Sequence, residues 1–384
     1  MSNWKQTITQ VVGSVDDYFD ALQFKLRQKR GLAPAQILTF IGHGTHTVLY
    51  LRGRAIEDYS VVDARDTDSM WRNMLNMYRR FNSREIPYAR VEATFAGKAY
   101  PVRADDEGYF NVRIELDNPL PDDVIWHDIM LELLDYPSDA GARTVGKVIV
   151  PPKNAQFGVI SDLDDTVIKS DVVNVLKLVR NTFLYNSHTR LPFAGVAEFY
   201  HALQKGAGQG YNPIFYVSNS PWNLYDLLVD FFEVRGIPLG TFFLTDMGFT
   251  PTKFIRTNGA QNKFGTIKTL LETHPTLPFI LIGDSGEKDP EIYLKAVQTF
   301  PGRIRAIYIR DVTNLRRDSQ VAALIQQAAS LGAEMLLVPD TAAASAHALA
   351  RGYIAPEAIP AIREEKREDE KKNSAIEALI DKLP

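Results

Sequence analysis

The sequence predicts an α/β protein in which a parallel sheet with helices on both faces follows a smaller antiparallel β-sandwich and an N-terminal amphipathic helix. Apolar runs alternate with helical stretches over 155–350, which indicates βαβ units. Short β-branched and aromatic runs, separated by Gly, Pro, Asn and Asp, fill 35–150 and are typical of antiparallel strands. Within 1–34, apolar residues instead recur at helical spacing.

The composition limits the classes of function. A chain of 384 residues is too long for one typical core, and 45% apolar with 23% charged residues is ordinary for a globular protein. A net charge of −4 argues against nucleic-acid binding through bulk charge. The absence of cysteine excludes disulfides, zinc–thiolate sites and thiol nucleophiles. With no signal peptide and no apolar run approaching about 20 residues, we expect a cytoplasmic protein without a transmembrane segment.

The N-terminal helix has two interpretations. Its apolar face fits docking on the rest of the protein, whereas cations near its end fit a peripheral helix on a membrane surface. Docking is favoured because Asp16, Asp17 and Asp20 interrupt the basic character, and membrane contact remains the alternative.

The antiparallel region has a clear inward face. In the strand expected at 108–116, every second residue is apolar, namely Phe110, Val112, Ile114 and Leu116. A helical insertion is expected at 69–81. His43 and His46 are spaced as a metal pair, but no third ligand is in view, so ordinary surface or core roles are favoured.

A link containing two prolines, 150–158, leads into the second region. Six apolar runs predict the strands of the parallel sheet, at 157–161, 212–218, 241–245, 278–283, 303–309 and 333–339. A run of mixed charge at 363–372 predicts a charged helical tail over 351–384, solvated or frayed.

Polar side chains follow three of these runs. Asp162 and Asp164 close the first, Ser218 and Asn219 the second, and Asp284 with Asp289 a third. Ligands of open α/β sheets bind outside the carboxyl ends of the strands, so these groups converge if the strands are neighbours. Several carboxylates at one place fit a hard cation that keeps some of its waters, which is the preference of Mg²⁺.

These residues resemble the motifs of the haloacid-dehalogenase superfamily of phosphotransferases. The D-x-D-x-[TV] motif is matched at 162–166, the strand-ending Ser at Ser218, the helix-borne lysine at Lys263, and G-D-x-x-x-x-D at 283–289. The resemblance implies a Rossmann-like (haloacid-dehalogenase-like) sheet and Mg²⁺-dependent phosphoryl chemistry.

It also implies a role for each residue. Asp162 would attack phosphorus to give an aspartyl-phosphate, and Asp164 would protonate the leaving group and then activate water. Mg²⁺ would be held by Asp162, the backbone carbonyl of Asp164, and Asp284, with Asp289 orienting this shell from behind. The groups that would bind the phosphoryl oxygens are Thr166, Ser218, Asn219 and Lys263.

Asp165 stands where the superfamily commonly has glycine, and this narrows the resemblance. The runs SDLDDT, YVSNSPW and FILIGDSGEKDPEIY are similar to the phosphatidate phosphatases named for the yeast actin-patch protein and to their bacterial relatives, over 155–350. That family implies removal of phosphate from phosphatidate to give diacylglycerol. Asp165 itself receives no catalytic role; a helix cap or a contact behind the site is expected.

The segments between the motifs are expected to determine substrate specificity. The residues after Thr166 are long enough for a small helical cap, and the loop near 246–263 is a second candidate. Their cations are candidates for substrate binding, with surface solvation as the ordinary alternative: Lys169, Arg190, Lys253 and Arg256. Trp222 is expected to pack rather than to bind.

Three functions therefore stay open. The first is a phosphatase of a lipid phosphomonoester such as phosphatidate, and the second is a phosphatase of a soluble sugar, nucleotide or protein phosphomonoester. The third is a catalytically silent membrane- or protein-binding adaptor, which is disfavoured because a relic would be expected to lack at least one of the motif residues. Because the motifs contact only the phosphoryl group, they do not decide the substrate.

Overall fold

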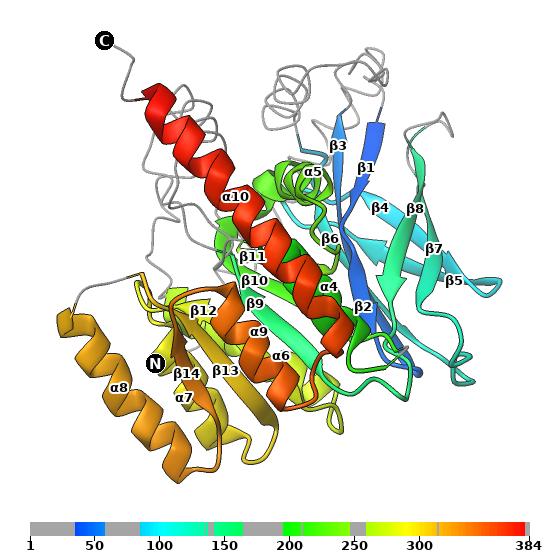
Figure 1. Cartoon of the computed structure of the whole chain (residues 1–384). Coiled ribbons are helices and arrows are strands. Elements are labelled where there is room, and N and C mark those ends of the chain that lie inside the picture. The colour runs from blue at the N-terminus through cyan, green and yellow to red at the C-terminus, as the bar shows by residue number, and fades with distance from the viewer. Residues whose placement is uncertain are drawn as a thin grey trace, which may run out of the picture.

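The computed structural model describes residues 35–57, 85–134, 136, 142–163, 195–208, 210–245, 259–312 and 315–380, with side chains of the last helix described to residue 369. The N-terminal helix, the helical insertion and the cap predicted above lie outside these residues. Figure 1 shows two sheets side by side, one in the β-rich region (35–150) and one in the parallel-sheet region (157–350). Within the described residues, no helix is long and apolar enough to cross a membrane.

The β-rich region forms one sheet of eight strands. The strands are β1 (Ala35–Thr39), β2 (Gly42–Gly44), β3 (Val48–Glu57), β4 (Arg90–Phe95), β5 (Lys98–Arg103), β6 (Tyr109–Glu115), β7 (Trp126–Leu133) and β8 (Arg143–Ile149). Their order is β1-β3-β2-β8-β7-β4-β5, and β6 pairs with the other edge of β3. β5 also lies against β6, so the sheet curls around its own core.

This arrangement corrects two details of the predicted antiparallel sandwich. The ladder is continuous through all eight strands, so there are not two separate sheets, and β2 pairs with β8 in parallel. The other pairings are antiparallel, as predicted. The predicted alternation in β6 is confirmed, since Phe110, Val112 and Ile114 are buried in the core of this sheet while the residues between them are exposed.

The second sheet is parallel and has six strands in the order β11-β10-β9-β12-β13-β14. The strands are β9 (Gly158–Asp162), β10 (Ile214–Pro221), β11 (Thr241–Thr245), β12 (Phe279–Asp284), β13 (Ile304–Arg310) and β14 (Met335–Val338). Each coincides with one of the six predicted apolar runs. The chain moves outward from β9 in one direction and from β12 in the other, so the order reverses between these two neighbours.

Helices cover both faces of the parallel sheet, as predicted. The helices are α4 (Val196–Lys205), α5 (Tyr225–Arg235), α6 (Gly259–Thr273), α7 (Asp289–Thr299), α8 (Leu315–Ser330), α9 (Thr341–Ala350) and α10 (Ile359–Ile380), with short 3₁₀ turns η1 (Trp222–Leu224) and η2 (Pro356–Ala358). Successive strand residues point to opposite faces, so Val159 joins the core with α4, α5 and α9, while Ile160 joins the core with α6, α7 and α8.

The tail is helical, as predicted, and its first part packs on the rest of the protein. Its helix α10 crosses α4 and α9 (Figure 1), and Ile362 is fully buried. Lys366 binds Asp340 at 2.7 Å, and Asp369 accepts a hydrogen bond from the backbone N–H of Gly195 at 2.9 Å. The mixed charges of the run therefore include specific partners, which the sequence pattern did not reveal.

Candidate active site

The polar ends of three strands meet in the middle of the parallel sheet. β9 lies between β10 and β12, and Val217 of β10 is paired with Asp162 of β9. On the other side, Ile282 of β12 is paired with Ser161, which places Asp284 beyond the same edge as Asp162. Because the strand order reverses here, this is the edge at which an open α/β sheet forms its ligand site.

Three carboxylates gather at this edge. Asp162, Asp284 and Asp289 each offer one oxygen within 4.8 Å of the others. All three are buried, with 2%, 5% and 0% of their surface exposed. Buried carboxylates are rare unless cations or hydrogen bonds compensate them.

One lysine supplies part of that compensation. The Nζ of Lys263, on α6, lies 2.7 Å from Asp162 Oδ1, 2.5 Å from Asp289 Oδ1 and 3.2 Å from Glu287 Oε2. Its side chain is 2% exposed. A single ammonium group therefore faces three carboxylates, and the cluster keeps an excess of negative charge.

The loop after β12 holds its own acid in place. Asp284 Oδ1 accepts hydrogen bonds from the backbone N–H groups of Gly286 and Glu287, at 2.7 and 3.0 Å. The N–H of Asp284 donates to Asp289 Oδ2 at 3.3 Å. Gly283 makes this fold-back feasible, since a Cβ at that position would lie 2.2 Å from Asp289 Oδ2.

An arginine from α8 braces this loop from outside. Arg317 donates to the carbonyls of Ser285 and Glu287, at 2.8 and 2.6 Å, and forms a two-pronged ion pair with Glu291 at 2.7 and 2.9 Å. Planar guanidinium groups suit such paired contacts. The loop that carries Asp284 is therefore fixed at both ends.

Burial and repulsion shift the protonation of the cluster. Burial, followed by the nearby Asp289 carboxylate, raises the pKa of Asp162 well above its usual range, although Lys263 opposes the shift. Burial raises the pKa of Asp289 to about 6 against the same opposition. Burial would lower the pKa of Lys263, but the carboxylates of Asp162 and Asp289 outweigh it and raise that pKa.

The donor set fits a hard divalent cation. The oxygens that cluster are all carboxylate oxygens, and Asp162 Oδ2 is buried with no hydrogen-bond partner among the described residues. A cation beside this oxygen would supply the positive charge that Lys263 alone does not.

Ser218 lies in β10, directly after the residue that is paired with Asp162. The residue is 4% exposed, and its Oγ accepts a hydrogen bond from the N–H of Ser220 at 3.0 Å. The carbonyl of Asn219 accepts a hydrogen bond from Thr245 Oγ1, on β11, at 2.5 Å. The N–H of Leu163 donates to the carbonyl of Val217, which ties the ends of β9 and β10 together.

The structure thus brings together six of the predicted site residues: Asp162, Ser218, Asn219, Lys263, Asp284 and Asp289. The remaining ones lie outside the described residues, namely Asp164, Asp165, Thr166, Lys169, Arg190, Lys253 and Arg256. Sequence reasoning missed Glu287, although it lies inside the G-D-x-x-x-x-D motif. It also missed Arg317, which has no local signal because its partners lie 26–32 residues away along the chain.

The two histidines of the β-rich region have separate surroundings. His43 is buried and stacks on Tyr50 with ring centroids 5.0 Å apart, and burial followed by His274 lowers its pKa to about 3. His46 Nε2 lies 3.3 Å from Asp122 Oδ1. A packing role for His43 is therefore what the structure shows.

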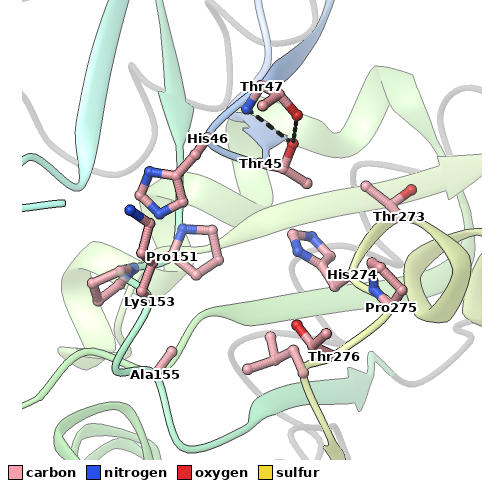
Figure 2. A pocket seen from close by; sticks show the side chains of 12 residues that line it. Thr45, His46, Thr47, Pro151, Lys153, Ala155, Thr273, His274, Pro275 and Thr276 are labelled. Atoms are coloured by element: carbon pink, nitrogen blue, oxygen red, sulfur yellow. Dashed lines mark hydrogen bonds between the residues drawn. The ribbon is translucent and has the colours of Figure 1, made fainter. Parts of the chain in front are cut away.

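A cavity of about 500 Å³ lies elsewhere, between the two sheets. Figure 2 shows His46 and Lys153 on one side of it and Thr273, His274 and Thr276 on the other. The turn that contributes residues 273–277 leads into the start of β12, so this cavity lies at the amino end of the parallel strands. None of the predicted site residues lines it, so it is distinct from the acidic cluster.

Comparisons with known proteins agree with the location of the cluster. Residues 157–311 match the family described as "Phosphatidate phosphatase APP1, catalytic domain". Phosphatidate phosphatase APP1 of Saccharomyces cerevisiae is 32% identical over 188 residues, which are 48% of this chain and 31% of that protein. An uncharacterized protein of Schizosaccharomyces pombe is 30% identical over 41% of this chain and 25% of its own length. The chain therefore spans about a third or less of these relatives.

Solved structures add no functional information. A carbohydrate acetylesterase from Xanthomonas citri covers 77% of this chain and 75% of its own, at 12% identity, but with a TM-score of 0.26. Such a low score supports no argument. The family match includes all six site residues that the structure brings together, and residues 157–311 are therefore similar to the APP1-type phosphatidate phosphatase catalytic domains.

Proposed function

We propose that the protein is a Mg²⁺-dependent phosphomonoester hydrolase that works through an aspartyl-phosphate, with phosphatidate as its substrate. One observation carries the proposal. Three buried carboxylates gather at the carboxyl ends of β9 and β12, two of them, Asp162 and Asp289, share the ammonium group of Lys263, and Asp162 Oδ2 is left without a partner among the described residues. An excess of buried negative charge is unfavourable in a purely structural cluster and useful in a cation and phosphoryl site.

Asp162 is the proposed nucleophile. One of its carboxylate oxygens attacks phosphorus, the bond from phosphorus to the ester oxygen breaks, and the leaving oxygen takes a proton from the carboxyl group of Asp164. Asp164, now a carboxylate, removes a proton from a water molecule that attacks the aspartyl-phosphate. Inorganic phosphate leaves, and both aspartates return to their starting states. The position of Asp164 in this scheme rests on its spacing from Asp162, because it lies outside the described residues.

The neighbouring groups hold the transferring phosphoryl group. Lys263 is aligned by its contacts to Asp162 and Asp289, and it neutralises charge on the phosphoryl oxygens. Ser218 and Asn219 close the adjacent strand and donate hydrogen bonds to those oxygens, together with Thr166. Asp289, whose two oxygens meet Lys263 and the N–H of Asp284, acts as an orienting group.

The proposed cation is held by Asp162, Asp284 and the backbone carbonyl of Asp164. When bound, Mg²⁺ neutralises the charge that develops on the phosphoryl oxygens and orients them. The unpartnered oxygen of Asp162 supports this assignment.

Phosphatidate is proposed because the matched family carries that activity in its description. We also propose that the catalytic sheet has the Rossmann-like arrangement of the haloacid-dehalogenase superfamily. The proposed domains are 35–150 for the β-rich region and 155–350 for the catalytic region. The protein would contact the surface of the membrane that contains the lipid. The proposed substrate-binding cations lie outside the described residues and are Lys169, Arg190, Lys253 and Arg256.

The test measures phosphate release. The purified chain is given p-nitrophenyl phosphate, phosphatidate vesicles and a panel of soluble sugar, nucleotide and peptide phosphomonoesters, each with Mg²⁺ or with chelator. We expect Mg²⁺-dependent release, with phosphatidate the best substrate by kcat/KM. Equal or faster turnover of a soluble monoester would replace the lipid, and release that survives chelation would reject the cation.

The same experiment separates the enzyme from an adaptor. An adaptor would bind vesicles but release no phosphate from any substrate. Deletion of residues 1–30 with vesicle sedimentation as the readout then tests the N-terminal helix, and unchanged sedimentation would reject its role at the membrane.

A further inference from the structure

The β-rich region contacts the parallel-sheet region next to the proposed phosphate-binding residues. We infer that this region positions the end of β10, and that Arg54 and Asn223 are the positioning residues through which it acts on Ser218 and Asn219. The inference rests on the proposed function and assigns a role in it to the β-rich region.

Several of these contacts are made to η1, which directly follows β10. Asn223 Oδ1 accepts hydrogen bonds from Arg54 Nη1 at 3.0 Å and from the hydroxyl of Tyr109 at 3.1 Å. Both donors belong to the β-rich region, and they lie 169 and 114 residues away along the chain. An arginine can only donate, so the oxygen of the Asn223 amide must face it.

Aromatic packing holds the same turn. The ring of Phe40, from the β-rich region, lies 4.5 Å from the ring of Trp222 and 4.7 Å from that of Tyr225, measured between centroids. The guanidinium of Arg52 lies 5.0 Å from the ring centroid of Trp222. The hydroxyl of Tyr225 accepts a hydrogen bond from the N–H of Ile41 at 2.9 Å. Trp222 therefore packs, as its position in the sequence suggested.

Arg54 is itself held rigidly. The residue is 8% exposed, its Nε donates to the carbonyl of Glu107 at 3.0 Å, and its Nη2 lies 3.0 Å from Glu85 Oε1. Its guanidinium also lies 4.6 Å from the ring centroid of Tyr109. A buried guanidinium with this many partners has little freedom, so it can fix the position of Asn223.

The turn is connected to the site by a short segment. Three residues lie between Asn219 and Asn223, and the Asn219 end of that segment is held by Thr245, whose Oγ1 donates to the carbonyl of Asn219. Ser218 Oγ accepts from the N–H of Ser220 within the same segment. A shift of η1 would therefore be transmitted to the two residues proposed to bind phosphoryl oxygens. Misplacement of such groups by about 1 Å lowers rates on the order of 10²-fold.

The alternative is that these contacts only join the two regions. Thr241 provides the matched control, because its Oγ1 donates to the carbonyl of Gly42 at 3.0 Å across the same interface and the residue is 3% exposed. Thr241 is paired with Phe215, at the start of β10, so it lies at the opposite end of that strand from Ser218. Thr241→Val removes an interface hydrogen bond without approaching the site.

The experiment compares Asn223→Ala, Asn223→Asp and Thr241→Val with the parent chain. It measures kcat and KM for p-nitrophenyl phosphate, the inhibition constant of inorganic phosphate, and the melting temperature. We expect Asn223→Ala to lower kcat/KM and to weaken phosphate inhibition on the order of 10-fold or more. Asn223→Asp keeps an acceptor for Arg54 and Tyr109, so its kcat/KM and its phosphate inhibition constant should return most of the way to the parent values. Thr241→Val should stay within about twofold of the parent in both quantities.

The outcomes distinguish failure of the positioning role from failure of the proposed function. Kinetics of Asn223→Ala within twofold of the parent, or equal losses in Asn223→Ala and Thr241→Val that follow their melting temperatures, would overturn the positioning role. If Asn223→Ala does not fold, Tyr109→Phe is used instead, because it removes only one of the two donors to Asn223. This variant should keep its melting transition and lower kcat/KM about 2- to 5-fold. An unchanged kcat/KM would overturn the positioning role. A parent chain that neither hydrolyses the ester nor binds phosphate would reject the proposed function, and the positioning role with it.

Discussion

The two ends of the parallel sheet bury ionisable groups in opposite ways. At the carboxyl end, the carboxylates of Asp162, Asp284 and Asp289 gather together, and those of Asp162 and Asp289 contact the ammonium group of Lys263. At the amino end, near the cavity of Figure 2, His43 and His274 are buried, and burial is the largest cause that lowers their pKa values to about 3 and about 4. Burial therefore favours the neutral form of the two histidines, whereas the carboxyl end holds more carboxyl groups than ammonium groups.

This difference separates a structural site from a chemical one. Neutral histidines are tolerated in a core because burial penalises only their charged form. Buried carboxylates around a single lysine avoid the cost of burying charge only by taking up protons. The raised pKa values of Asp162 and Asp289 indicate this tendency. A site that keeps this excess charge is expected to meet a cation or a reacting group.

The largest expected effect is at the carboxyl end, in catalysis. Asp162→Asn removes the proposed nucleophile and should lower phosphate release by at least about 10³-fold, while relief of the charge excess leaves the melting temperature unchanged or higher. Lys153→Ala, in the cavity at the amino end, is the matched control and should leave turnover within about twofold. Equal effects of the two substitutions would remove the distinction between the ends.

The next effect is on stability at the same end. Lys263→Met leaves buried carboxylates without their ammonium partner, which should lower the free energy of unfolding by about 3–5 kcal/mol in denaturant titrations. Lys268→Met, on the exposed side of the same helix, should change it by less than about 0.5 kcal/mol. Adding Asp162→Asn to Lys263→Met should recover part of the lost free energy of unfolding. If the effects of the two substitutions simply added, Lys263 and Asp162 would not be energetically coupled.

The cation should stabilise the carboxyl end directly. Mg²⁺ at about 100 times its dissociation constant should add about 2.7 kcal/mol to the free energy of unfolding, because it binds the folded state. The measurement is thermal unfolding with Mg²⁺ or with chelator, for the parent chain and for Asp284→Asn. A Mg²⁺-dependent rise of equal size in both would mean that the cation binds elsewhere.

A smaller effect is expected at the amino end, through pH. The folded-state pKa values of His43 and His274 lie below the ordinary 6.5, so the unfolded chain takes up protons first as the pH falls. Stability should therefore be lost below pH 6.5, by about 2 kcal/mol for each histidine at pH 5, and the loss should continue to about pH 4 for His274 and about pH 3 for His43.

The variant His274→Leu should flatten this dependence, measured as the free energy of unfolding between pH 7 and pH 5. His201→Gln, which alters an exposed histidine on α4, is the control and should leave the slope as it is. An unchanged slope in His274→Leu would show that other groups cause the acid sensitivity.

Much of the fold follows from local patterns in the sequence. The six parallel strands are largely apolar runs, because most residues of the central strands are buried on both faces of the sheet. The ends of these runs also locate Asp162, Ser218 and Asp284, since residues that follow neighbouring strands meet at one edge. The strands β7 and β8 are harder to delimit from the sequence. They expose Trp126, Met130 and Val145 on their outer face, so apolar residues stand on both faces and blur the alternation.

The remaining features depend on long-range contacts. Nothing near Lys263 in the sequence shows that it meets three carboxylates, and the partners of Arg317 lie on another helix and loop. The bond between Arg54 and Asn223 joins residues 169 positions apart. Such pairs become visible only when the sheets are assembled.

The central claim, covalent chemistry at Asp162, is tested most directly by trapping. The protein is mixed with Mg²⁺ and a phosphomonoester labelled in its phosphoryl group, quenched with acid within one turnover, and digested for peptide mapping. We expect the label on the peptide that contains Asp162, as an acyl phosphate that is released by alkali, and none on Asp162→Asn. Phosphate release without labelled peptide at any quench time, or label on another residue, would contradict the account.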